Sequence, residues 1–553
     1  MEEELQPATV VSIPICETWR YSDDYNTYIP LKEKSVSDAI GNAYQKWNPK
    51  TPVLISAQTG AGKNYFVKTI LLPETVRQGK KILIISNRIA LSYQTKADIV
   101  KNLKVKKIYS SEWLRDQEEF DDYVTIFTYQ RFITKINDID PKEYLYVVLD
   151  EAHFFMADAT FNYKTGFILE RIPKTFSASI RVYLTATPDE VGGYILESEK
   201  KAHRDKIHFL SYDLERDYSY VQPLYFKEVE EITKEIELDA NSEDKWLIFV
   251  TNKEKGKILQ DSLLKAKIDV VYLDSELKEE AMEEFYYKIL DNDAFPNKVL
   301  ISTSVLDNGV NFRDINLKNV VIFSYDKTTF LQMLGRKRIV KSGESVKLYI
   351  QNKTAGMLNG KQRILVKKQA AVSMFKKDKN KFLSEYYSST IEDFKIIHGL
   401  FYFVNGNCYY NPLGLGKLEN DIQLLSNLID KIKKDASADI KEQLSWLGLA
   451  ETFDEENWLE CNGRQENLQK LSDFLIKMVE RSYRDGAEQK ELGIELKSLY
   501  DKVYGPRKNA RSDFYGTKII TDILEEVKSP YKLEIKKENK TSVWNFIEKS
   551  KGC

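Results

Sequence analysis

The sequence predicts an α/β protein with two tandem parallel-sheet domains followed by a mostly α-helical C-terminal region. Short apolar runs alternate with longer helix-forming stretches in two consecutive parts of the chain, as in parallel sheets whose strands are joined by helices. After about residue 356 the apolar residues recur at intervals of three and four, as on one face of a helix. A chain of 553 residues also exceeds what one hydrophobic core supports.

The apolar runs define the two predicted sheets. The first domain, residues 41–215, contains TPVLIS, KILIIS, YVTIFT, YLYVVLD and IRVYLT, and the second, residues 216–355, contains WLIFV, DVVYL, KVLIS, NVVIFS and VKLYI. Residues 1–40 are irregular and rich in tyrosine, so we interpret them as an N-terminal extension. Residues 356–553 include ENDIQLLSNLIDKIKK, which has helical periodicity, and form the predicted helical C-terminal domain.

Charge and composition exclude several classes of protein. With 82 Lys and Arg against 84 Asp and Glu, the net charge of −2 gives no sign of a nucleic-acid partner. The chain has no run of about 18 apolar residues and an acidic start unlike a signal peptide, so we expect a cytoplasmic protein without a membrane partner. The four cysteines form no C-x-x-C pair, which argues against a zinc ribbon or a disulfide framework.

A glycine-rich segment, AQTGAGKN, stands between the first predicted strand of the first domain and a predicted helix. In such a loop, backbone N–H groups and the helix N-terminus bind phosphate, and a lysine reaches the terminal phosphates. A plain turn is the alternative. The predicted cofactor-binding residues of this loop are Ala57, Thr59, Gly60, Ala61, Gly62, Lys63 and Asn64.

Asn64 departs from the usual pattern of this loop, which has Ser or Thr at that position to ligate Mg²⁺ through a hydroxyl. If its amide oxygen takes that place, Asn64 is a metal ligand. The alternative is that Asn64 weakens metal binding and leaves a slow or inactive ATPase.

Two carboxylates follow the apolar strand that ends at Leu149. Asp150 and Glu151 stand at the carboxyl end of this strand, where ligands bind in parallel sheets. We expect Asp150 to hold Mg²⁺ and Glu151 to orient and deprotonate the attacking water. Acidic residues at strand ends are common, so these two carboxylates are evidence for a site only together with the other motifs of the chain.

In their order along the chain, the glycine-rich loop, the DEAH sequence at 150–153 and the TATP sequence at 185–188 resemble motifs I, II and III of superfamily 2 helicases of the DEAD/DEAH-box type. The resemblance implies two RecA-like domains that hydrolyse ATP between them, with ATP and Mg²⁺ as cofactors and nucleic acid as partner. It also implies that His153, Thr185 and Thr187 couple the state of ATP to the grip on nucleic acid.

Other segments resemble the remaining motifs of the family. Residues 86–91 and 128–130 are similar to motifs Ia and Ic, residues 249–252 to motif IV, and residues 302–311 to motif V. In the family such loops contact the phosphate backbone, a mode independent of sequence. The residues implied to bind nucleic acid are Arg88, Thr128, Gln130, Thr251 and Thr303, and those implied to bind ATP are Gly309 and Asn311.

The sequence QMLGRKR at 332–338 resembles motif VI, whose arginines reach the γ-phosphate. The resemblance implies catalytic roles for Gln332, which would face His153, and for Arg336 and Arg338. Ile339 stands where the family has its second arginine, so the choice of arginine finger stays open between Arg336 and Arg338. This compact form is similar to that of origin-binding helicases of herpesviruses and of mobile elements.

Two functional hypotheses follow. The first is an ATP-dependent helicase or translocase that acts on DNA in preference to RNA, because motif VI resembles that of DNA helicases and the DEAD sequence is absent. The second is an ATP-gated clamp or scaffold for a replication, conjugation or defence complex, which the Asn64 substitution favours. In either case the C-terminal helical region is a candidate surface for protein partners.

Overall fold

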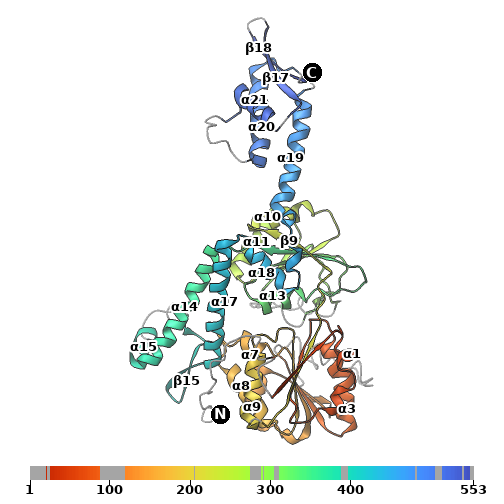
Figure 1. Cartoon of the computed structure of the whole chain (residues 1–553), viewed down its shortest axis with the longest axis vertical. Coiled ribbons are helices and arrows are strands. Elements are labelled where there is room, and N and C mark those ends of the chain that lie inside the picture. Colours follow the sequence, from red (N-terminus) through yellow and green to blue (C-terminus); the bar gives the residue numbers. More distant parts are fainter. Residues whose placement is uncertain are drawn as a thin grey trace. The chain divides into compact units, whose positions relative to one another are not determined.

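The structure of the chain is a computed structural model (Figure 1). It describes residues 20, 25–86, 119–121, 123–204, 206–274, 288–289, 292–303, 310–387, 397–479, 482–504, 513–527, 529–538 and 541–548. The chain forms two compact units, and each is treated by itself. The larger comprises Met1–Pro223 and Lys227–Phe453, and the smaller comprises Leu224–Phe226 and Asp454–Cys553. No helix of the described residues is long and apolar enough to cross a membrane.

The first sheet has the strand order β1-β8-β2-β7-β6-β3-β5-β4. All neighbouring strands are parallel except β4, which is antiparallel to β5 at the edge. The strands are β1 (Asn26–Leu31), β2 (Val53–Ser56), β3 (Lys81–Ser86), β4 (Glu119–Asp121), β5 (Val124–Thr128), β6 (Tyr144–Leu149), β7 (Ile180–Thr185) and β8 (Phe209–Leu214).

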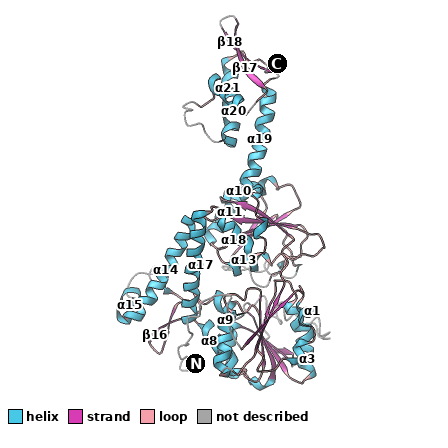
Figure 2. Ribbon diagram, viewed as in Figure 1, coloured by secondary structure: helices cyan, strands magenta, loops and turns pink. Residues whose placement is uncertain are grey.

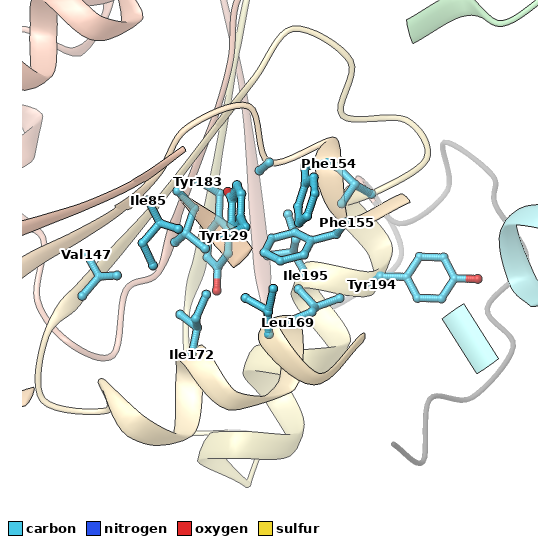
Figure 3. Close-up of a cluster of buried hydrophobic side chains, with 14 of the residues drawn as sticks. Ile85, Tyr129, Val147, Phe154, Phe155, Leu169, Ile172, Tyr183, Tyr194 and Ile195 are labelled. Carbon is cyan, nitrogen blue, oxygen red and sulfur yellow. The ribbon is translucent and has the colours of Figure 1, made fainter. Parts of the chain in front are cut away.

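Helices cover both faces of this sheet. Successive side chains of its buried strands point to opposite faces, so both faces are apolar and need to be covered. Thus Leu54 belongs to one hydrophobic core, whereas Val53 and Ile55 belong to the other. Figure 3 shows the core that contains Tyr129, Phe154 and other buried rings. The helices of this domain are α1 (Val36–Ile40), α2 (Lys63–Phe66), α3 (Leu72–Arg77), α6 (Tyr129–Lys135), α7 (Phe154–Ala157), α8 (Lys164–Thr175) and α9 (Gly192–His203).

The second sheet has the order β11-β12-β10-β13-β14-β9, and its first five strands are parallel. All ten apolar runs therefore form strands of the two predicted sheets, which confirms the predicted fold class (Figure 2). The elements are β9 (Val221–Phe226), α10 (Val229–Leu238), β10 (Lys245–Phe249), α11 (Lys253–Lys265), β11 (Val270–Leu273), β12 (Val299–Ser302), β13 (Leu317–Ile322), α13 (Lys327–Leu334) and β14 (Val346–Gln351).

Four strands of the two large sheets were not predicted. The clearest case is β1, which lies in the part of the chain that sequence analysis treated as an irregular extension but pairs along its whole length with β8. Its sequence, NTYIPL, is partly exposed and contains Pro30, as suits an edge strand but not a continuous apolar run. The other three are β4, β8 and β9.

Beyond the second sheet the described residues are mostly helical, as predicted, with two β-hairpins in addition. The larger unit adds α14 (Ala355–Lys377), α15 (Lys379–Tyr386), β15 (Phe401–Val404), β16 (Asn407–Tyr410), α17 (Pro412–Lys434) and α18 (Ala438–Trp446). The smaller unit contains α19 (Leu459–Met478), α20 (Gly486–Tyr504), α21 (Thr517–Glu526), β17 (Tyr531–Glu538) and β18 (Thr541–Glu548), which share a core around Leu496 and Tyr515.

A buried ion pair ties β7 to α9 in the first domain. Arg181 and Glu199 are fully buried, with Arg181 Nη2 2.8 Å from Glu199 Oε2, and the Tyr183 hydroxyl also donates to Glu199 at 2.7 Å. Replacing Glu199 with alanine leaves an uncompensated buried guanidinium, so we expect the free energy of unfolding to fall by about 3–5 kcal/mol. Urea denaturation measures this loss. As a control on the same helix, Glu197→Ala removes a partly exposed pair with Lys200 and should cost less than about 1 kcal/mol.

Candidate functional site

The glycine-rich loop joins β2 to α2 with two glycines in the left-handed region. Gly60 has φ +97° and Gly62 has φ +83°, conformations that L side chains rarely adopt. The next residue, Lys63, begins α2 and is buried, and its Nζ donates to the carbonyl oxygens of Ala57 at 2.8 Å and Gln58 at 3.3 Å. Burial lowers the pKa of Lys63, although Glu151 and Asp150 oppose this effect. The lysine is therefore held inside the loop and close to both carboxylates.

Backbone hydrogen bonds connect the three predicted motifs of the first domain. The N–H of Ala57 donates to the Thr185 carbonyl at 3.0 Å, and the N–H of Ala152 donates to the Leu184 carbonyl at 2.8 Å. These bonds follow from the sheet order, in which β7 lies between β2 and β6. The carboxyl ends of the three strands thus bring the glycine-rich loop, the DEAH turn and the TATP turn to one edge of the sheet.

The two carboxylates of the DEAH turn have different electrostatic environments. Burial and the neighbouring charge of Glu151 raise the pKa of Asp150 to about 7. Burial alone would raise the pKa of Glu151 as well, but the charges of His153, Lys63 and the two motif VI arginines lower it. Glu151 also has φ +52°, an uncommon conformation for a residue other than glycine. The turn therefore holds Glu151 ionised in a buried position.

Asn64 contacts the carboxylate that was predicted to share its metal ion. Its side chain forms a hydrogen bond with Asp150, which favours the ionised form of that carboxylate and lowers its pKa. The two predicted metal-binding residues, Asp150 and Asn64, are therefore neighbours in the structure. Because a carboxylate accepts hydrogen bonds, the Asn64 amide N–H faces Asp150 in this arrangement.

Gln332 of the second domain bonds to Glu151 and is itself held by Arg336. The amide nitrogen of Gln332 donates to Glu151 Oε2 at 3.2 Å, and Arg336 Nη2 donates to Gln332 Oε1 at 2.7 Å. His153 Nδ1 lies 3.3 Å from the same oxygen of Glu151. The expected partner of Gln332 was His153, but both side chains instead converge on Glu151. Arg336 also donates to the Val310 carbonyl at 3.3 Å, so its guanidinium is used within the second domain.

Arg338 approaches the glycine-rich loop from the second domain. Its Nε donates to Asn311 Oδ1 at 2.7 Å, while its buried Nη1 has no hydrogen-bond partner within the described part of the chain. A Cβ added to Gly60 would lie 2.5 Å from that Nη1. Burial, with the nearby charge of Arg336, lowers the pKa of Arg338 to about 9. The arginine is thus oriented by Asn311 with one nitrogen directed at the loop.

A cavity of about 610 Å³ opens where the loop meets the second domain. Thr59, Gly60 and Ala61 line it from the first domain, and Arg338 lines it from the second. Nearby, a Cβ added to Gly335 would lie 2.5 Å from the Thr59 Cβ, so only glycine permits this approach of motif VI to the loop. The orphaned Arg338 nitrogen, the two left-handed glycines and the buried lysine fit a phosphate chain.

The predicted coupling residues lie around the same site. Thr185 is fully buried and its Oγ1 accepts a hydrogen bond from the Thr187 N–H at 3.1 Å. Thr187 Oγ1 is buried without a hydrogen-bond partner among the described residues. The side chain of Thr185 thus stabilises the TATP turn. The chain then continues into Asp189 and Glu190, which face the second domain.

The predicted nucleic-acid-binding residues follow the ends of three other strands. Thr128 caps α6 after β5 by accepting from the Arg131 N–H, and Gln130 is exposed. Thr251 is exposed after β10, and Thr303 is buried after β12. Within the described part of the chain these residues form no hydrogen bond or ion pair with the ATP site, so their role stays a prediction. Arg88 and Gly309 lie outside the described residues.

Tyr129 stands between two predicted nucleic-acid-binding residues and contacts the DEAH turn, a contact that the sequence did not predict. Its hydroxyl donates to the Asp150 carbonyl at 3.1 Å, and its ring stacks on Phe154 with centroids 4.4 Å apart. Tyr129 therefore connects the predicted nucleic-acid loop to the DEAH turn. An aromatic residue directly after a buried strand is too common for the sequence to distinguish this one.

The raised pKa of Asp150 predicts how Mg²⁺ binding depends on pH. A metal ion binds the ionised carboxylate, so Mg²⁺ affinity should rise as the pH passes upward through about 7. We expect the Mg²⁺ concentration for half-maximal ATP hydrolysis to fall by about tenfold between pH 6 and pH 8. Steady-state titrations at fixed ATP measure it. A half-saturating Mg²⁺ concentration that stays constant over this range would contradict the assignment.

Two family models match consecutive parts of the chain. Residues 30–190 match the model for the res subunit of type III restriction enzymes, and residues 227–339 match the model for the helicase conserved C-terminal domain. No curated protein sequence matches significantly.

Similar solved structures include Dbp5 of S. cerevisiae bound to RNA and ADP BeF3, which is 16% identical with a TM-score of 0.42 and covers 57% of this chain and 83% of that chain. Another is a DEAD box protein from the hyperthermophile Methanococcus jannaschii, which is 19% identical with a TM-score of 0.34 and covers 59% of this chain and 87% of that chain.

Proposed function

The chain belongs to superfamily 2 of the helicases, and from this premise we propose that it hydrolyses ATP between its two RecA-like domains in order to translocate along or unwind DNA. The observation that carries the proposal is the convergence of residues from both domains on one site. Lys63 and Glu151 come from the first domain, and Gln332 and Arg338 come from the second. A site completed only when two domains meet can link hydrolysis to their relative motion.

Each residue has a distinct chemical role in this proposal. The backbone of residues 57–62 and Lys63 bind the phosphates of ATP. Glu151, kept ionised by the positive charges around it, orients the attacking water and accepts its proton. Gln332 holds the Glu151 carboxylate from the second domain and is itself held by Arg336.

Arg338 is the arginine finger of the proposed reaction. Among the described residues, Arg336 donates to Gln332 and to the Val310 carbonyl, whereas the Nη1 of Arg338 lies beside Gly60 without a hydrogen-bond partner. Charge that develops on the γ-phosphate in the transition state is stabilised by such a preorganised donor. These contacts favour Arg338 over Arg336, the choice that the sequence left open.

Asp150 and Asn64 would hold Mg²⁺ on the side of the loop that faces the DEAH turn. The metal ion supplies positive charge to the phosphate oxygens when it is bound. An amide oxygen and a carboxylate are both suitable hard ligands for it. For Asn64 to act as one, its side chain must present the oxygen instead of the amide N–H that faces Asp150.

DNA is the proposed polymer in preference to RNA. The compact motif VI and the match of the first domain to a restriction-enzyme subunit support this choice. Contacts from Thr128, Gln130, Thr251 and Thr303 would be made with the phosphate backbone, which is common to both polymers. Protein partners, if the C-terminal helices bind them, would come in addition to the polymer.

Steady-state ATP hydrolysis with Mg²⁺ tests the proposal, measured without polymer and with single-stranded DNA, duplex DNA or RNA. Lys63→Ala serves as the blank, because it removes the cation of the phosphate-binding loop. We expect DNA to raise kcat above the polymer-free rate and RNA to raise it less. Equal rates with all polymers and without any would contradict the proposed motor. Greater stimulation by RNA would indicate that the polymer is RNA and not DNA.

A second candidate function is an ATP-gated clamp without rapid turnover, and the hydrogen bond between Asn64 and Asp150 favours it. If that bond keeps Asp150 from the metal ion, Asn64→Thr should raise kcat by about tenfold or more by restoring a hydroxyl ligand. A kcat that falls or stays constant in Asn64→Thr would show that asparagine is a competent ligand, and the clamp would lose its support.

A further inference from the structure

Helix α17 lies in the C-terminal region but begins inside the core of the first RecA-like domain. Leu413 is fully buried in that core, and the side-chain amide of Asn411 donates to the Ala159 carbonyl at 2.7 Å. A Cβ added to Gly414 would lie 2.5 Å from the same carbonyl oxygen. The first turn of α17 is therefore built for close contact with this domain.

Tyr194 of the first domain contacts α17, and its side chain is directed away from the aromatic rings of the core. In Figure 3, Tyr194 points away from the other labelled side chains. Its hydroxyl lies where a Cβ at Gly416 would be, so glycine at this position is what allows the contact. Two glycines in the first turns of a helix weaken it by about 1 kcal/mol each relative to alanine, and the close approach explains why they are present.

The rest of α17 is attached to the second domain. Its Leu425 and Ile429 pack with Leu358 of α14, which follows β14 of the second sheet after three residues. Next along the chain, α18 packs Trp446 against Phe330 of α13 with ring centroids 5.3 Å apart. One helix thus contacts both domains (Figure 1).

Lys417 of α17 is a buried lysine between the two domains, and three carboxylates lie close to it. Lys417 Nζ lies 3.1 Å from Glu190 Oε1, 3.5 Å from Asp326 Oδ2 and 2.6 Å from Asp421 Oδ1, and its side chain is 7% exposed. Glu190 follows the TATP turn of the first domain. Asp326 caps α13 of the second domain by accepting from the Thr329 N–H at 2.7 Å.

Both interdomain partners of Lys417 adjoin residues of the ATP site. Glu190 is three residues beyond Thr187, and Asp326 begins the helix that carries Gln332 and leads to Arg338. A second ion pair, between Asp189 and Lys327 at 2.8 Å, joins the same two segments, but the lysine side chain is 40% exposed, so it contributes less. Without Lys417, Glu190 and Asp326 would be partly buried carboxylates of like charge on opposite domains, with side chains 18% and 32% exposed.

We infer that α17 is a strut between the two RecA-like domains, and that Lys417 is a positioning residue that holds the TATP turn of the first domain against the start of α13 in the second. Lys417 does not contact the ATP site and acts through these two segments. Its effect on hydrolysis rests on the proposed function, whereas its effect on the relative position of the domains does not.

The distance between the domains is the direct readout of this inference. A pair of spin labels can be placed on cysteines introduced at the exposed Lys174 of α8 and Lys265 of α11. Cys16, Cys461 and Cys553 are replaced with serine, and Cys408 is buried. Pulsed electron paramagnetic resonance of the full chain without nucleotide then gives the distribution of distances for each variant.

Lys417→Met keeps the length of the side chain and removes its charge, and we expect a broader distribution at longer distances than in the parent chain. Lys417→Arg should restore the parent distribution. Lys431→Met is the matched control, because Lys431 lies on the same helix in an exposed pair with Glu442 and should leave the distribution unchanged. If Lys417→Met does not fold, Glu190→Gln removes the first-domain partner and should broaden the distribution as well.

Identical distributions for the parent chain, Lys417→Met and Glu190→Gln would overturn the inference. In the same variants, the polymer-stimulated kcat should fall by about tenfold while KM for ATP stays within about twofold, because the phosphate-binding loop is untouched. Failure of the parent chain to hydrolyse ATP would instead refute the proposed function and leave the distance result to decide the role of Lys417.

Discussion

Replacing Arg338 with alanine is expected to reduce kcat for ATP hydrolysis by roughly 10³- to 10⁵-fold, the usual effect of losing an arginine finger. The physical reason is the position of its Nη1, which is buried beside Gly60 without a hydrogen-bond partner among the described residues. Its affinity for ATP should change far less, since the loop and Lys63 remain. Single-turnover hydrolysis with excess enzyme separates the chemical step from binding.

The variant Arg336→Ala is the comparison for Arg338→Ala. Arg336→Ala should release Gln332, which loses two of its hydrogen bonds, and so act on hydrolysis indirectly. Because Arg336 is buried and forms hydrogen bonds with Gln332 and Val310, this variant should also lower the free energy of unfolding. Arg338→Ala should lower it less, because the Nη1 of Arg338 has no hydrogen-bond partner among the described residues and only its Nε bonds to Asn311. A variant Arg338→Ala with wild-type kcat would show that the finger is another residue.

Glu151→Gln is expected to lower kcat by about 10²- to 10⁴-fold while ATP still binds. Glutamine keeps the size of the side chain but cannot accept the proton of the attacking water. We expect the variant to fold, since glutamine fills the same buried space and can still bond to Gln332. Rapid-quench measurement of the hydrolysis step checks it.

Glu143→Gln is the matched control for this variant, since Glu143 precedes the same strand, β6, and its side chain is 49% exposed. It should hydrolyse ATP at the wild-type rate. Wild-type turnover by Glu151→Gln itself would remove Glu151 as the general base and direct attention to His153 and the rest of the turn.

The fold followed from the sequence wherever strands are buried on both faces, because such strands are continuous apolar runs. VLIS at β2 and YLYVVL at β6 are examples, and both are fully or almost fully buried. The first-domain site followed from them, since the motifs stand directly after these strands. β1 could not be predicted in this way because an edge strand such as NTYIPL needs fewer apolar residues.

Residues that act through another domain were much harder to predict. The spacing of QMLGRKR does not distinguish Arg336 from Arg338, and the proposal for Arg338 rests on the different contacts of the two guanidinium groups. Lys417 stands in PLGLGKLEND, where nothing in the local sequence marks it as buried. Its partners Glu190 and Asp326 are far away along the chain, so their meeting is a property of the tertiary structure.

Strand displacement tests the central claim most directly, that ATP turnover between the two domains drives movement on DNA. A labelled oligonucleotide is annealed to a longer DNA strand, and its release is followed with ATP and Mg²⁺, with Arg338→Ala as the blank. We expect release by the wild-type chain that requires ATP hydrolysis and is lost in the blank. Contradiction would come from ATP-dependent DNA binding with neither release nor multiple turnovers, the behaviour of a clamp.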